Sequence, residues 1–336
     1  MSDASSSTDE WFTRLEPVQP PADLPHHPDD PRLGEVTEFW RGGAVTVQPG
    51  RAVLIGFPVD EGVRRNNGRT GAAAAPFSIR RWLYRLTPTD CQEGISLADN
   101  RLLDLGNLRS VEDLEDAQQA LGAVVAAVLQ AHAVPIVLGG GHETAYGHYL
   151  GYVGAGVAAG IINMDAHLDV RPCTDGRGSS GTPFRQALEH PSHPLAGEHY
   201  VCLGAQPQSV SRSHWDYVHQ CGGTVRWFDG STFPLVEHFQ RECQRMAEAQ
   251  RQVYLSVDAD VVRAADAPGV SAPNPAGLPG REVAACLRLA GSLPAVSSLD
   301  LVEINPRFDQ DDRSARWAAV AIWNFVIGLA LRNWQA

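Results

Sequence analysis

The chain has 336 residues, of which 43% are hydrophobic and 20% charged, so it has enough apolar material for one large domain or two ordinary ones. A small scaffold held by disulfides is excluded. The 39 acidic residues outnumber 27 basic ones, all of which are Arg, and the formal net charge is −12. This balance argues against nucleic acid as a partner, because binding a phosphate backbone requires clustered cations. A small anionic substrate needs only a few converging arginines.

The sequence also indicates a cytoplasmic protein. Residues 1–10 are Ser-rich and acidic, without the basic start and apolar core of a signal peptide. The longest uncharged runs, 121–142 and 317–331, are interrupted or too short to cross a bilayer, which needs about 20 apolar residues. The six cysteines show no C-x-x-C spacing, so neither a zinc knot nor a redox pair is expected. We therefore expect reduced thiols and no membrane partner.

The chain divides near residue 50. Residues 1–50 contain seven prolines and little periodicity, which predicts an N-terminal arm lying over a single domain of residues 51–336. Beyond it, in chain order, the expected strands are Ala52–Gly56, Arg101–Leu105, Val134–Leu138, Val157–Asn163, His199–Leu203, Val225–Phe228, Val253–Val257 and Ala295–Glu303. The helices expected among them are Phe77–Leu86, Val111–Ala131, Ser209–Gln220, Leu235–Ala249, Gly280–Leu289 and Asp312–Leu331. This alternation predicts a parallel sheet covered on both faces, either an open doubly wound sheet or a closed barrel.

Four of the apolar runs end in residues that bind metals. They lead into Gly139-Gly140-Gly141-His142-Glu143, into Asp165, His167 and Asp169, into Asp258 and Asp260, and into Glu303. In both parallel architectures ligands gather beyond the carboxyl ends of the strands, so these side chains are expected at one edge of the sheet. Each piece alone has an ordinary explanation, because a lone D-x-D most often caps a turn or a helix. Their joint occurrence favours a metal site.

The spacing of the acidic residues supports this interpretation. Asp165, His167 and Asp169 alternate along an extended segment, so their side chains face one point, and Asp258 and Asp260 repeat the spacing. Four clustered carboxylates need neutralising cations, with more charge than one ion readily supplies. A mixed set of Asp and His suits an ion like Mn²⁺.

In this order the motifs resemble those of the ureohydrolases, the superfamily of arginases and agmatinases, over roughly residues 52–331. The resemblance implies a catalytic domain with a three-layer αβα sandwich, built on a mostly parallel sheet of about eight strands, and two Mn²⁺ per subunit. One ion would be held by His142, Asp165, Asp169 and Asp258, and the other by Asp165, His167, Asp258 and Asp260. The bridging hydroxide would attack the substrate, with Asp169 passing its proton to the leaving amine and Glu303 gripping the cationic C–N group. Family members commonly form homo-oligomers, trimers or hexamers.

The chain departs from the arginase pattern at Gly141, at Glu143 and in the loop after Asp169, which has no His before Phe184. In these features the chain resembles the ureohydrolases of histidine degradation, which hydrolyse N-formimidoyl-L-glutamate to L-glutamate and formamide. That substrate carries two carboxylates, which Arg recognises well. The candidate arginines are Arg64, Arg65 and Arg69 after the first strand and Arg171, Arg177 and Arg185 in the later loop. Two alternatives stay open: a ureohydrolase acting on a guanidino acid or an agmatine-like substrate, and an inactive metal-binding relative.

Overall fold

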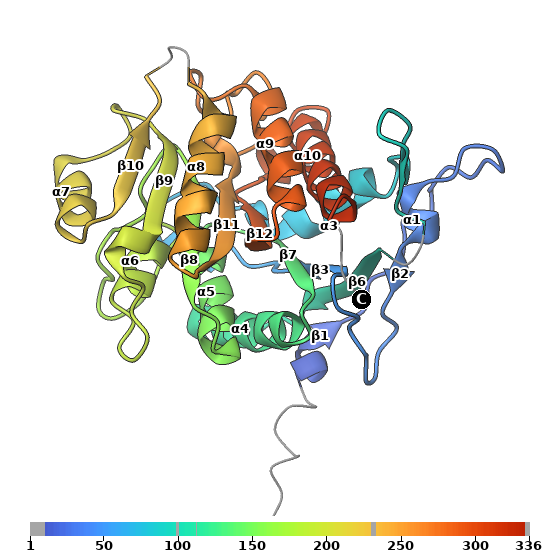
Figure 1. The fold of residues 1–336 in the computed structure, drawn as a ribbon, viewed down its shortest axis with the longest axis horizontal. Helices are drawn as coiled ribbons and strands as arrows, with labels where there is room; N and C mark the ends of the chain where they lie inside the picture. Colours follow the sequence, from blue (N-terminus) through green and yellow to red (C-terminus); the bar gives the residue numbers. More distant parts are fainter. Residues whose placement is uncertain (1–10, 99–100, 112, 230–232, 333–336) are drawn as a thin grey trace, which may run out of the picture.

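A ten-stranded sheet runs through the middle of the molecule (Figure 1). The computed structural model describes residues 11–98, 101–111, 113–229 and 233–332. In sheet order the strands are β1 (Leu15–Glu16), β6 (Leu102–Leu108), β3 (Ala52–Gly56), β7 (Val134–Leu138), β12 (Val296–Val302), β11 (Gln252–Asp258), β8 (Ala159–Met164), β9 (Tyr200–Ala205) and β10 (Thr224–Trp227), with β2 (Glu38–Phe39) also paired to β6. All pairings are parallel except that of β1 with β6. The open sheet with helices on both faces confirms the predicted αβα sandwich.

Helices cover the two faces of the sheet and bury two separate apolar cores (Figure 1). One core contains residues of α3 (Ala75–Leu83), α8 (Leu235–Glu248), α9 (Gly280–Ser292) and α10 (Arg313–Ala330). The other contains residues of α4 (Leu114–Gln130), α5 (Thr144–Ala155), α6 (Pro183–Leu188) and α7 (Arg212–Gln220). Burial on both faces explains why the central strands read as continuous apolar runs.

The remaining elements are short. They are α1 (Leu33–Val36), α2 (Glu61–Arg65), a small hairpin of β4 (Thr89–Asp90) and β5 (Ile95–Ser96), and the 3₁₀ helices η1 (Trp11–Arg14), η2 (Ala72–Ala74), η3 (Gly197–His199), η4 (Ala259–Val261) and η5 (Pro306–Phe308). The predicted arm supplies β1 and β2, which pair with β6 and widen the sheet beyond eight strands. No helix among the described residues is long and apolar enough to cross a membrane.

The eight predicted strands and six predicted helices all occur, with ends that differ by a few residues. The pattern does not predict α5, because its glycines lower helix propensity. Those glycines let α5 approach α4 closely: a Cβ on Gly151 would lie 2.3 Å from Val125 Cγ1, and one on Gly147 would lie 3.0 Å from Gln118 Cα. Packing against α4 therefore outweighs the low propensity of the segment.

The strand order brings the four motif-bearing strands together. β7, β12, β11 and β8 are adjacent in the sheet, although they are far apart in sequence. Because these strands are parallel, their carboxyl ends meet at one edge. The sheet topology therefore places all four motifs side by side.

Candidate metal centre

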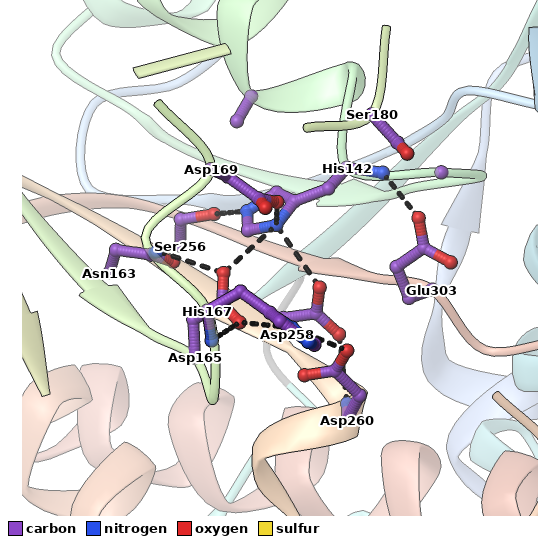
Figure 2. A network of polar contacts seen from close by, with 12 residues as sticks. His142, Asn163, Asp165, His167, Asp169, Ser180, Ser256, Asp258, Asp260 and Glu303 are labelled. Carbon is purple, nitrogen blue, oxygen red and sulfur yellow. Dashed lines mark hydrogen bonds and ion pairs between the residues drawn. The ribbon is translucent and has the colours of Figure 1, made fainter. Parts of the chain in front are cut away.

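The candidate metal-binding side chains lie at or just beyond the carboxyl ends of β7, β8 and β11 and are close together in space (Figure 2). His142 lies in the turn between β7 and α5, and Asp165 directly follows β8. Asp258 is the last residue of β11 and the N-cap of η4, and its Oδ1 accepts a hydrogen bond of 2.8 Å from the Asp260 backbone N–H. Each side chain is thus held by a strand end.

The first group of possible ligands surrounds His142. Its Nδ1 lies 2.9 Å from Asp169 Oδ2, 3.1 Å from Asp258 Oδ2 and 3.4 Å from Asp165 Oδ2. The four ligand atoms lie within 4.8 Å of one another. This is the set that the resemblance implies for one ion.

The second group surrounds His167, whose Nδ1 lies 3.1 Å from Asp260 Oδ2 and 3.4 Å from Asp165 Oδ1. Asp165 therefore offers one oxygen to each group, the geometry of a bridging carboxylate. Asp258 belongs to the first group by distance but not to the second. Its predicted bridging of both ions stays a prediction.

The environment of these atoms fits cations. His142 Nδ1 and Asp260 Oδ1 are buried and have no hydrogen-bond partner among the described residues. Burial, followed by the charges of Asp260 and Asp165, raises the pKa of the Asp258 carboxyl well above its usual range. Buried charges this close are costly unless they are compensated. Carboxylate and imidazole donors without thiolates suit a Mn²⁺-like ion.

Hydrogen bonds fix the direction of the shared carboxylate. Asp165 Oδ2 accepts from Asn163 Nδ2 at 3.0 Å, and Oδ1 accepts from the His167 backbone N–H at 2.7 Å. Each oxygen keeps a second lone pair that can face its own ligand group. The carboxylate is therefore oriented by the chain itself.

Two acidic residues at this edge adopt strained backbone conformations. Asp169 has φ +46° and Glu303 has φ +65°, in the left-handed region that costs a non-glycine residue about 1–3 kcal/mol. Glu303 Oε1 accepts from the His142 backbone N–H at 2.9 Å, while the buried Oε2 has no partner among the described residues. Burial and the charges of Asp258 and Glu143 raise the pKa of Glu303 well above its usual range. This free acceptor can take a cationic donor.

The glycine turn before His142 permits a close approach of the chain. A Cβ on Gly140 would lie 1.8 Å from the Val59 carbonyl oxygen. Glu143, to which the sequence assigned no role, is fully buried, and its Oε1 accepts from the Gly62 backbone N–H at 2.7 Å. Burial raises the pKa of Glu143 to about 8. Glu143 thus ties the His142 turn to α2.

Three of the predicted arginines, Arg65, Arg171 and Arg177, line one cavity of about 510 Å³ together with Asn66, Ser179 and His214. Arg65 is held by Glu115 at 2.6 Å, and Arg177 by Asp113 at 3.2 Å. The Arg171 backbone N–H donates to the Gly181 carbonyl oxygen at 2.8 Å, but its guanidinium forms no hydrogen bond or ion pair with any described residue. Burial, followed by the charge of Arg171, lowers the pKa of His214. Arg171 follows Asp169 by two residues in the chain, so the cavity lies next to the first ligand group.

The other predicted arginines lie outside this cavity lining. Arg69 donates from Nε to the Ser271 carbonyl oxygen at 2.9 Å, with its guanidinium 4.2 Å from the Phe308 ring centroid. Arg185 pairs with Glu189 at 3.0 Å. Arg64 pairs with Glu61 at 2.6 Å. Their roles in substrate binding stay predictions.

A three-layer fold with paired Asp and His groups at the carboxyl edge of its sheet defines the arginase-like class of α/β proteins. The chain belongs to the arginase family, whose model matches residues 50–328. It is 40% identical over 290 residues to a formimidoylglutamase of Citrobacter koseri, covering 83% of this chain and 85% of that one. A formimidoylglutamase of Geobacillus thermodenitrificans is 38% identical over 281 residues, covering 82% and 84%. The crystal structure of Trypanosoma cruzi formiminoglutamase with Mn²⁺ superposes with a TM-score of 0.80 at 33% identity, covering 90% and 100%.

Proposed function

We propose that this protein hydrolyses the formimidoyl C–N bond of N-formimidoyl-L-glutamate. Water adds to the amidine carbon and the C–N bond to the glutamate nitrogen breaks, which releases formamide and L-glutamate. The six Asp and His side chains gathered at the sheet edge are the observation that carries the proposal. The names of the relatives that match over more than four-fifths of the chain support the choice of substrate.

We propose that two Mn²⁺ ions occupy the two ligand groups. His142, Asp165, Asp169 and Asp258 would hold the first, and Asp165, His167, Asp258 and Asp260 the second. The pair, when bound, lowers the pKa of water so that a nucleophile is available near neutral pH.

Asp169 and Glu303 would then divide the remaining chemistry. Asp169 is the most exposed carboxylate of the first group, with 16% of its side chain accessible. Its carboxylate would accept a proton from the attacking water and pass it to the leaving nitrogen. Glu303 Oε2 would accept a hydrogen bond from the protonated amidine, and its charge would hold that cation in place.

The arginine-lined cavity would hold the other end of the substrate. The glutamate part carries two carboxylates, and Arg171 offers a guanidinium that no described residue engages. Arg177 is half exposed and its pair with Asp113 is long, so it too is available to an anion. A ureohydrolase whose substrate has a cationic or neutral tail has less need of several arginines in this cavity.

A substrate panel tests the proposal. The purified, Mn²⁺-loaded protein should release formamide from N-formimidoyl-L-glutamate, and arginine, agmatine and guanidino acids should yield little urea. Faster release of urea from arginine or agmatine would overturn the assignment of substrate. Absence of any hydrolysis with two bound ions would favour the inactive relative.

We also propose that residues 51–336 form the catalytic domain, that the protein forms a trimer or hexamer, and that it acts in the cytoplasm. The match of the family model from residue 50 onward supports the first of these. Sedimentation velocity and cell fractionation test the other two.

A further inference from the structure

A buried polar network lies behind the metal centre, where the chemistry described above makes no use of it. Its members are Asp300 of β12, Tyr254 and Ser256 of β11 and His148 of α5, and each is fully buried. Asp300 Oδ2 accepts from His148 Nδ1 at 3.0 Å and from the Tyr254 hydroxyl. Asp300 Oδ1 accepts from the Ser256 hydroxyl at 2.6 Å. The Asp300 carboxylate thus accepts three hydrogen bonds.

The network ends on a metal ligand. Ser256 Oγ lies 3.1 Å from His142 Nε2 (Figure 2). A serine hydroxyl has one hydrogen, and here it is donated to Asp300. Ser256 can therefore only accept from His142, which requires the proton of that imidazole to be on Nε2. The lone pair is then on Nδ1, the atom that faces Asp165, Asp169 and Asp258.

Strand pairing and packing make this arrangement rigid. Ser256 and Asp300 are register partners in the parallel pair of β11 and β12. Tyr254 lies two residues before Ser256, so both side chains are on the same face of the sheet. The His148 ring packs on the Tyr254 ring with centroids 4.1 Å apart. Asp300 therefore has little freedom to turn away from Ser256.

We propose that Asp300, acting through Ser256, is a positioning residue that fixes the tautomer and the orientation of His142 for the first metal ion. This inference rests on the proposed function, because it takes the ligand groups to be metal sites. It assigns a task to residues beyond the six ligands. It also predicts that damage to the network affects the two ions unequally, because His167 and Asp260, which serve only the second ion, have no hydrogen bond or ion pair with the network among the described residues.

The test is a titration of the metal-free full-length protein with Mn²⁺, followed by calorimetry and by electron paramagnetic resonance of free and bound ion. Asp300→Asn replaces the charged acceptor with a weaker neutral one that also carries two donors. We expect the affinity of one ion to fall about 10- to 100-fold, the usual effect of losing such a partner, while the other keeps the parent value. Ser256→Ala should do the same.

Tyr152→Phe is the matched control, because it also removes a buried hydroxyl near the network. That hydroxyl forms hydrogen bonds with Ser297 and Ser298 and not with Asp300. The substitution should leave both affinities unchanged. If Asp300 acts through Ser256, the double variant should weaken the first ion no more than Ser256→Ala alone.

Parent affinity for both ions in Asp300→Asn would overturn the inference, and so would an equal loss of both ions, which indicates general structural damage. If Asp300→Asn does not fold, Ser256→Ala decides by the same criteria. A parent protein that binds fewer than two Mn²⁺ would instead refute the proposed function.

Discussion

Replacing Glu303 by Gln isolates the charge that is proposed to hold the amidine. The substitution keeps the shape of the side chain and one carbonyl oxygen, so the acceptor for the His142 backbone N–H at 2.9 Å can be retained. What is lost is the ability to carry a negative charge beside the cationic amidine at Oε2, a buried atom with no partner among the described residues. The change therefore tests one interaction with little disturbance of the turn.

The expected magnitude follows from the kind of hydrogen bond. A bond to a charged group contributes about 1.5–3 kcal/mol, and a neutral one about 0.5–1.5 kcal/mol. The midpoints of these ranges differ by about 1.3 kcal/mol, close to the ~1.4 kcal/mol that corresponds to a tenfold change in rate. Glu303 is 5% exposed, so solvent screens this charge little, and tenfold is a lower bound.

The assay is formamide release at saturating and limiting substrate, with bound manganese measured on the same samples. We expect kcat/KM to fall at least about tenfold while two ions remain bound. Turnover at the parent rate would refute the role of Glu303, whereas loss of manganese would show that the residue supports the metal sites instead.

Three other changes test separate parts of the site. Asp165→Ala should remove the shared ligand and abolish both manganese binding and hydrolysis, measured by metal analysis; retention of two ions would contradict its bridging position. Arg171→Ala should raise KM at least about tenfold with unchanged metal content, whereas Arg69→Ala, outside the cavity lining, should change KM less; equal effects would contradict the cavity assignment. In the metal-free protein, folding raises the pKa of Glu143 from 4.5 to about 8, so unfolding releases a proton between these values and stability should decline as pH rises through them. Between pH 5 and 8 the melting temperature should fall less steeply with pH for Glu143→Gln than for the parent, and an unchanged slope would contradict this.

The sequence was sufficient to predict the central strands and the metal-binding motifs, because both depend on local patterns. Asp165, His167 and Asp169 alternate directly after an apolar run, and the parallel sheet brings that run beside Asp258. Such signals need no knowledge of distant packing.

Features that depend on distant partners could not be predicted in this way. Nothing in the sequence distinguishes Arg65 from Arg171 as a substrate-binding candidate. In the structure Glu115 forms an ion pair with Arg65, whereas no described residue forms one with the Arg171 guanidinium. Asp300 lies within an apolar run, and only the register of β12 with β11 places it beside Ser256. Arginine roles and buried networks are therefore set by tertiary pairing.

The position of β12 has a consequence for how the protein matures. This strand is near the end of the chain, at Val296–Val302, but it lies between β7 and β11 at the centre of the sheet. Until it is inserted, β7 with His142 is separated from the half of the sheet that contains β8 and β11. That half carries the other five ligands, so it can assemble the second site by itself, while the first site requires closure of the sheet. We therefore expect newly made chains to capture the second ion early and the first ion only as the last step of folding.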